Sequence, residues 1–93
     1  MLFVADYENF INAPEGLILP PKIKEKALKI LKNGQCTAVA GQNVYDEIAK
    51  KPTDILLKAY EKGDYVWDEN DIYYFEKYDM PLFENFLSYC CGN

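Results

Sequence analysis

The sequence predicts a single compact α+β domain over residues 1–93, mostly helical, with a short β-hairpin or small sheet. Three observations predict this fold class. A chain of 93 residues has room for one domain with one modest core. Its 49% hydrophobic and 27% charged residues are typical of a globular protein. Apolar residues recur at helical spacing in several segments, whereas one region is rich in β-forming residues.

Residues 21–33 carry the most regular helical pattern. Pro21 suits the first turn of a helix, where its missing N–H costs nothing, and Asn33–Gly34 is typical of a helix end. The apolar face comprises Ile23, Ala27, Leu28, Ile30 and Leu31. The lysines at 22, 26 and 29 line the outer face, which indicates either a solvated surface or a phosphate-binding one. The acidic chain favours the solvated surface.

Residues 2–11 fit two structures. Leu2–Ala5 could open a strand, but the apolar residues from Phe3 to Ile11 also share one helical face. We favour the helix. Asn12–Gly16 then interrupts any regular structure, because it combines asparagine, proline and glycine.

The middle of the chain predicts a short strand and two helices. Cys36–Ala40 is compatible with a strand that ends at Gly41. The spacing of apolar residues predicts one helix over 44–50 and another from Thr53 to Gly63, separated by Pro52. The pair has the outline of a helix-turn-helix, although the acidic charge of the chain argues against DNA binding.

Residues 64–79 combine six acidic and six aromatic residues. Tyr65–Trp67 and Ile72–Phe75 favour two strands of a hairpin, and Asp68–Asp71 is a polar turn between them. Beyond the hairpin, Asp79 is a good N-cap for a last helix that runs to about Cys91.

Charge and missing residue types narrow the function. The sequence contains no histidine, and all ten of its basic residues are lysines. These absences exclude both histidine-dependent nucleophilic catalysis and bidentate contacts between arginine and phosphate. The net charge is −5, and residues 53–93 hold nine acidic residues against three lysines. This charge favours a basic protein partner over nucleic acid.

The hairpin is the candidate site. If one aromatic face packs on the core, the other presents aromatic residues ringed by carboxylates, a combination that suits binding to a basic partner. The candidate partner-binding residues are Tyr65, Trp67, Asp68, Glu69, Asp71, Tyr73, Tyr74 and Glu76. The alternative is an ordinary hairpin whose acidic turn only keeps its tip soluble.

The leading hypothesis is a non-enzymatic inhibitor or regulator that binds a basic protein, including a nucleic-acid-binding one. A second copy is another candidate partner, because the lysine face of one chain could meet the acidic half of another. The alternatives are a self-associating structural protein and a small carboxylate- or metal-dependent hydrolase that uses Asp6 or Asp68 and Asp71.

No cofactor or metal is expected. Residues 68–79 lack the glycine of a calcium-binding EF-hand loop, and the three cysteines, Cys36, Cys90 and Cys91, do not follow a zinc or disulfide spacing. The chain shows neither a signal peptide nor an apolar run long enough to span a membrane. We therefore expect a cytoplasmic protein with reduced thiols.

Overall fold

The computed structural model describes residues 1–92, which form four helices and four strands. In chain order these are β1 (Leu2–Phe3), α1 (Tyr7–Asn12), α2 (Pro21–Lys32), β2 (Gln35–Asp46), β3 (Lys51–Lys62), β4 (Tyr65–Asp68), α3 (Glu69–Tyr78) and α4 (Glu84–Cys91). Helices make up about 39% of the protein and strands about 33%. The prediction of an α+β fold is confirmed. The prediction that the domain is mostly helical, with only a short hairpin, overstated the helical share.

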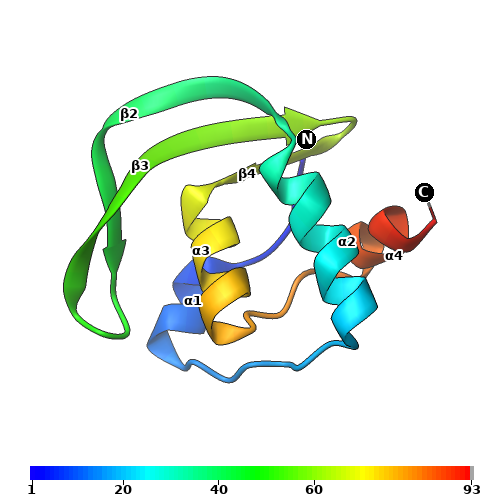
Figure 1. Ribbon diagram of the computed structural model, residues 1–93, viewed down its shortest axis with the longest axis horizontal. Helices are drawn as coiled ribbons and strands as arrows, with labels where there is room; N and C mark the ends of the chain where they lie inside the picture. Colours follow the sequence, from blue (N-terminus) through cyan, green and yellow to red (C-terminus); the bar gives the residue numbers. More distant parts are fainter. Residues whose placement is uncertain (93) are drawn as a thin grey trace.

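The four strands form one mixed sheet in the order β1-β4-β3-β2. The β2–β3 and β3–β4 pairs are antiparallel, whereas β1 lies parallel to β4, with Leu2 opposite Tyr65. The long β2–β3 hairpin arches over α1 and α3, and α2 packs beside α4 (Figure 1). The parallel pair brings the N-terminus to the strand that leads into α3.

One hydrophobic core lies between the sheet and the helices. Trp67 in β4 is 3% exposed, and its indole N–H donates a hydrogen bond to the carbonyl oxygen of Leu31 in α2 (3.0 Å). On the other strand of the β3–β4 pair, the Tyr60 ring stacks against Trp67. The other core residues are Val4, Phe10, Ala27, Leu31, Ile72, Tyr74, Phe75, Met80, Leu82, Phe86 and Cys90.

The prediction of helix α2 is confirmed, with Pro21 in its first turn and Asn33 as its C-cap. Ala27 and Leu31 are buried as its apolar spacing indicates. The N-terminal segment contains both a strand and a helix, the two structures that the sequence allowed for residues 2–11. Leu2–Phe3 is a strand, and Tyr7–Asn12 is a helix that begins after the Asp6 N-cap. A single helix over residues 2–11 was therefore wrong.

The two helices expected over residues 44–62 are a β-hairpin. Strand β2 continues through Gly41 to Asp46, and β3 begins at Lys51, one residue before Pro52. The β2–β3 pairing contains register shifts around Ala40–Gln42, so the hairpin bulges there. The expected helix-turn-helix outline is wrong, because cross-strand pairing and contacts with α3 outweigh the helical spacing of the apolar residues.

Asp46 attaches the tip of this hairpin to α3. Its side chain is fully buried, and its two oxygens accept hydrogen bonds from the N–H groups of Ile48 and Ala49 and from the hydroxyls of Tyr73 and Tyr78. Burial would raise the pKa of this carboxyl, but the hydrogen bonds outweigh it and hold the pKa well below its usual range. The charged form of Asp46 therefore stabilises the fold.

The expected hairpin over residues 64–79 is instead a strand followed by a helix. The Asp68–Asp71 segment is the start of α3 and not the predicted turn. The Asp68 side chain accepts hydrogen bonds from the N–H groups of Asn70 and Asp71, and the Asp71 side chain accepts one from the N–H of Asp68. This reciprocal arrangement is a capping box, which satisfies backbone groups at the first turn.

Asp79 also has a different role from the one predicted. It ends α3 in the left-handed conformation (φ 57°), which aspartate tolerates better than most residues. Its carboxylate pairs with Lys24 of α2 at 2.6 Å. The last helix begins at Glu84 rather than near Pro81, although it ends at Cys91 and buries Phe86 and Cys90, as expected.

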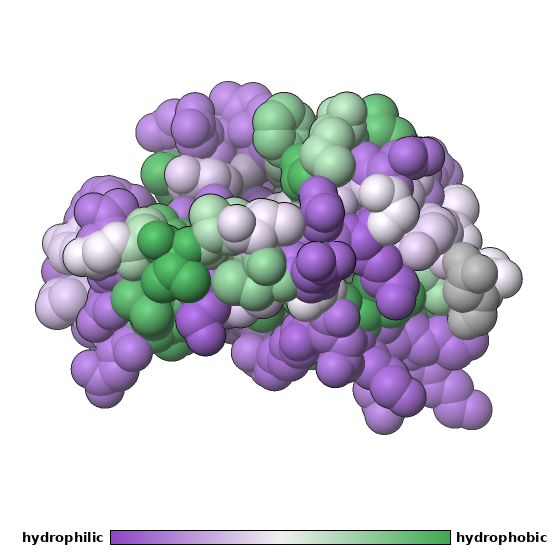
Figure 2. Space-filling view, turned by 90° about the horizontal axis from the view of Figure 1, so that it is seen from above, coloured by the Kyte–Doolittle hydropathy of each residue, from purple (hydrophilic) through white to green (hydrophobic). Residues whose placement is uncertain are grey.

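On the face of the molecule seen from above, apolar patches alternate with hydrophilic side chains (Figure 2). Among residues 1–92, none of the helices has the length and apolar character that crossing a membrane requires.

Candidate acidic cavity

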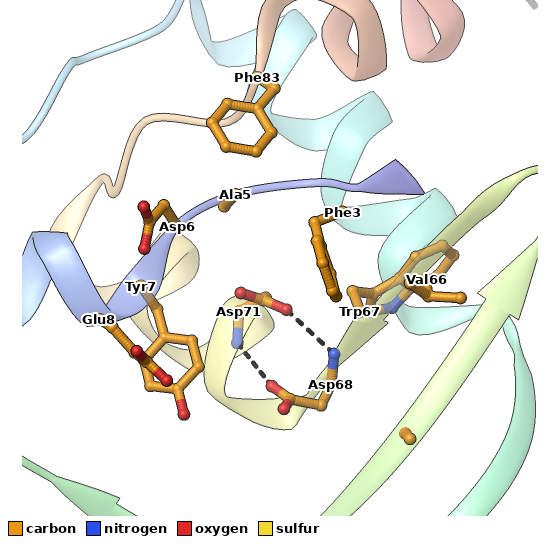
Figure 3. A pocket seen from close by; sticks show the side chains of 11 residues that line it. Phe3, Ala5, Asp6, Tyr7, Glu8, Val66, Trp67, Asp68, Asp71 and Phe83 are labelled. Carbon is orange, nitrogen blue, oxygen red and sulfur yellow. Dashed lines mark hydrogen bonds between the residues drawn. The ribbon is translucent and has the colours of Figure 1, made fainter. Parts of the chain in front are cut away.

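A cavity of about 530 Å³ lies between the N-terminal segment and the junction of β4 with α3. Figure 3 shows the side chains of Asp6, Glu8, Asp68 and Asp71 arranged around it. The remaining lining is largely apolar or aromatic: Phe3, Ala5, Tyr7, Ala59, Val66, Trp67 and Phe83. The cavity therefore combines carboxylates with apolar walls.

Asp71 is the most unusual residue of this cavity. Asp71 is only 8% exposed, and its Oδ2 atom accepts a hydrogen bond from the N–H of Asp68 (3.1 Å). The other oxygen, Oδ1, is buried and has no hydrogen-bond partner in the described part of the chain. In Figure 3 this oxygen lies on the side of the carboxylate turned away from Asp68. A buried oxygen without a donor is rare in proteins and calls for an explanation.

The electrostatic surroundings of Asp71 disfavour its charged form. Burial, and next the negative charge of Asp68, raise the pKa of Asp71 from the ordinary 3.8 to about 7, and the charge of Asp6 adds to this. Burial also raises the pKa of Asp68. Burial and the neighbouring carboxylates therefore act together against the ionisation of Asp71.

Tyr7 forms one side of the cavity. Its ring stacks on Tyr74 of α3, with 6.1 Å between the ring centroids. Burial and then the nearby charges of Asp68, Glu8 and Asp71 raise the pKa of its hydroxyl. Tyr7 therefore stays neutral.

None of the four cavity carboxylates forms an ion pair with a lysine of residues 1–92. The ion pairs of the structure join Lys24 to Asp79, Lys32 to Glu76, Lys50 to Glu47, and Lys77 to Asp46. The four lysines that form ion pairs therefore pair with acids outside the cavity. Within the same residues, no three metal-ligating side chains gather closely enough to hold a metal ion.

The predicted site residues separate into three groups. Asp68 and Asp71 line the acidic cavity, and Trp67 contributes an apolar wall from its core position. Tyr74 is also in the core, at 1% exposure, so the face that was expected to present both rings to a partner does not exist. Residues 69–78 form a helix that turns Tyr74 towards the core, and Trp67 is buried by its contacts with Tyr60 and Leu31.

The remaining predicted residues make structural contacts away from the cavity. Tyr65 packs against Phe86 and Tyr89 of α4. Tyr73 bonds to Asp46, Glu76 pairs with Lys32 at 2.8 Å, and Glu69 accepts a hydrogen bond from the Tyr60 hydroxyl. The aromatic residues of 64–79 thus mainly hold the fold together.

Sequence reasoning named Asp6 as a separate hydrolase candidate, but it missed that the N-terminal segment lies beside Asp68 and Asp71. Asp6, Tyr7 and Glu8 reach the cavity because β1 pairs with β4, a contact between residues about sixty positions apart along the chain. The spacing of Asp68 and Asp71, with an acid three residues after a good N-cap, is a capping-box signal that could have identified the helix start.

A second cavity, of about 630 Å³, has the opposite charge. Lys26 and Lys29 of α2 and Lys62 of β3 line it, together with Ile30, Asn33, Tyr89 and Cys90. No ion pair with an acid of residues 1–92 is formed by these three lysines. The chain therefore carries an acidic and a basic concave surface.

Comparison with protein-family models, with curated proteins and with solved structures finds no match. Function must therefore be inferred from the chemistry of the cavity.

Proposed function

We propose that this protein is a non-enzymatic binding module, inhibitory or regulatory, that takes a basic surface of a protein partner at the acidic cavity. The observation that carries the proposal is the set of four cavity carboxylates that form no ion pair with a lysine of the described residues 1–92. Holding such charges together costs stability, and strongly shifted pKa values in a concave site are typical of functional residues. A partner's cations would compensate the charge and speed association.

A second copy of the chain is one such partner. The cavity with Lys26, Lys29 and Lys62 offers the positive surface that an acidic cavity would meet. If this contact forms twice across a two-fold axis it gives a dimer, and if it forms once per pair of chains it is head-to-tail and leads to rings or open chains.

We expect capture of a basic partner to depend on Asp6 and Glu8, which are both exposed. The tagged chain would be incubated with cytoplasmic extract and with a differently tagged second copy at moderate salt. The double variant Asp6→Asn/Glu8→Gln should recover at least about fivefold less partner, because two steering charges are lost. Asparagine can still cap α1 in place of Asp6, so folding is preserved.

The matched control is Asp54→Asn/Glu25→Gln, the same pair of changes at exposed acids away from the cavity. It should capture as much partner as the wild type. Equal loss in both double variants would indicate non-specific charge attraction, and full capture by the cavity variant would refute the proposal. Asp68 and Asp71 are left unchanged because they cap α3.

A carboxylate-dependent hydrolase is a second candidate, because Asp71 has a pKa of about 7 and shares the cavity with Asp68. A general acid or base works best when its pKa lies near the working pH. Chromogenic esters, phosphoesters and glycosides would be incubated with the wild type and Asp71→Asn. Turnover that the substitution abolishes would support an enzyme; turnover by neither protein, or equally by both, would exclude Asp71 from such a role.

A further inference from the structure

We propose that two copies of this chain pair through the outer edge of strand β2, antiparallel and about a two-fold axis, so that their two sheets join into one. β2 is the last strand in the order β1-β4-β3-β2 and borders the hairpin on its outer side (Figure 1). Within residues 1–92, β3 is the only strand that pairs with β2, so the other edge of β2 offers backbone groups to a further strand. Of the described residues, none in β2 lines the acidic cavity, so this contact goes beyond the proposed function.

The free edge lacks the charges that normally protect one. Free edges in native sheets are usually short, or they carry charged residues or proline. Residues 33–45 are the longest stretch of the sequence without a charged side chain, and they contain no proline. The inner strand β3 instead carries a proline and five charged residues: Lys51, Asp54, Lys58, Glu61 and Lys62. Charge is therefore concentrated on the covered strand and absent from most of the free one.

The first half of β2 is the accessible part of this edge. All five residues of Gln35–Val39 are exposed, and the exposed fraction of Val39 is 57%. The end of the strand is less free, because Val44 and Asp46 are buried there. The contact between copies is therefore assigned to Gln35–Val39.

Bulges bend this edge and make it selective. The register of β2 against β3 shifts between Cys36 and Ala38 and again after Val39. Such bulges twist a free edge, which hinders pairing with a flat strand. A second copy of β2 has the same bend, and a two-fold axis perpendicular to the sheet gives both strands the same curvature. The bent edge therefore favours its own copy over an unrelated strand.

Charge and the number of free edges also favour a second copy. The chain has a net charge of −5, so two copies repel each other except across a surface without charge. A basic partner, in contrast, gains no attraction from an uncharged edge. The opposite edge of the sheet, β1, has only two residues. Once two β2 edges are paired, no long edge remains for a third copy, so the contact closes as a dimer.

Sedimentation velocity over a range of concentrations tests the dimer. Reducing conditions keep the exposed thiols of Cys36 and Cys91 from cross-linking copies. We expect the mass to approach twice that of the monomer as the concentration rises from about 10 μM to about 1 mM, by mass action. The dimer should persist at about 0.5 M salt, because backbone hydrogen bonds are not screened as contacts between charged surfaces are.

The double variant Thr37→Lys/Val39→Lys should raise the dissociation constant of the dimer at least about tenfold, because it places like charges along the shared edge. Both positions are exposed, so the monomer should keep its fold, which circular dichroism verifies. The matched control is Leu17→Lys/Ile18→Lys, which adds the same two lysines at exposed residues of the segment before α2. It should dimerise as the wild type does.

Amide hydrogen exchange of the wild type is a second readout that needs no variant. The outward N–H groups of Gln35–Val39 should exchange at least about tenfold more slowly at the high concentration, because they gain acceptors on the second copy. Amides of α4 should exchange equally at both concentrations.

Four outcomes would overturn the inference. The first is a chain that stays monomeric throughout, and the second is a dimer that Thr37→Lys/Val39→Lys retains. The third is a dimer that dissociates in salt without protection of Gln35–Val39, which would assign self-association to the charged cavities. The fourth is a monomer that captures from extract a protein which Thr37→Lys/Val39→Lys loses, because the edge would then take a foreign strand.

Discussion

Replacing Asp71 with asparagine is expected to stabilise the protein at pH 8 by up to about 4 kcal/mol and to leave its stability nearly unchanged at pH 3. Burial and the charge of Asp68 raise the pKa of Asp71 to about 7, against 3.8 for an ordinary aspartate. Above pH 7 the folded protein must therefore hold a charge that its surroundings disfavour. Asparagine keeps the shape and the acceptor for the N–H of Asp68, but carries no charge.

The sign of this effect sets the pH window. Below pH 3.8 Asp71 is protonated in both the folded and the unfolded chain, so it contributes nothing. Between about pH 4 and pH 7 the unfolded chain releases the proton more readily, and stability falls as the pH rises. Above pH 7 the loss is complete and stays constant.

Urea unfolding of the wild type and Asp71→Asn at pH 3, 5, 6 and 8 would measure this directly. The two curves of stability against pH should diverge between pH 4 and pH 7. Glu25→Gln, which removes an exposed acid on α2, should follow the wild type throughout. Parallel curves for the wild type and Asp71→Asn would mean that Asp71 titrates normally. Divergence would identify a residue kept at a cost in stability, as is common in functional sites.

Replacing Asp46 with alanine should have the opposite effect, lowering the free energy of unfolding at pH 7 by about 3–5 kcal/mol. Four donors then lose their acceptor: the N–H groups of Ile48 and Ala49 and the hydroxyls of Tyr73 and Tyr78. The hairpin tip would be held to α3 mainly by Tyr74, whose hydroxyl bonds to Tyr45 and Glu47. A loss of this size can unfold a small domain.

Asp46→Asn provides the version of this test that is most certain to fold. It retains one acceptor oxygen but no charge, so its cost should be smaller, about 1–3 kcal/mol. Because hydrogen bonds hold the pKa of Asp46 below its usual range, its stabilisation is present above pH 3.8 and disappears as the pH falls further. The difference between wild type and Asp46→Asn should therefore shrink below pH 3.8.

Glu47→Gln is the control for Asp46. It alters the adjacent acid, whose 3.7 Å pair with Lys50 is exposed, and should cost less than about 1 kcal/mol. Urea unfolding at pH 7 measures all three variants. A cost for Asp46→Ala no greater than that for Glu47→Gln would contradict the anchoring role of Asp46.

The local sequence was a good guide where its signals act within a few residues. Pro21, the apolar face around Ala27 and Leu31, and Asn33–Gly34 determine helix α2 from start to end. The inner face of α4, with Phe86 and Cys90, follows in the same way. The Asp68–Asp71 spacing also carried a helix signal, which our interpretation of the segment as a turn between β-forming residues did not use.

The site was predictable only in part. The acidic and aromatic character of residues 64–79 indicated where carboxylates would gather, and Asp68 and Asp71 do line the cavity. Trp67 and Tyr74 were candidates for an exposed face, but a helix at residues 69–78 buries Tyr74, and the cross-strand and α2 contacts of Trp67 bury it too. Spacing along the chain cannot distinguish an inner from an outer face until the element type is known.

By itself, the sequence determined the α+β class, helices α2 and α4, the acidic charge and the absence of histidine. The tertiary structure decided whether residues 44–62 are helix or hairpin, because the choice depends on strand pairing and on the hydrogen bonds that Asp46 accepts from Tyr73 and Tyr78, about thirty residues away. The tertiary structure also decided which residues line the cavity, since the pairing of β1 with β4 brings Asp6 near Asp71. Contacts between such distant residues leave no periodic pattern along the chain, and burial, which sets the chemistry of Asp46 and Asp71, arises only when those contacts form.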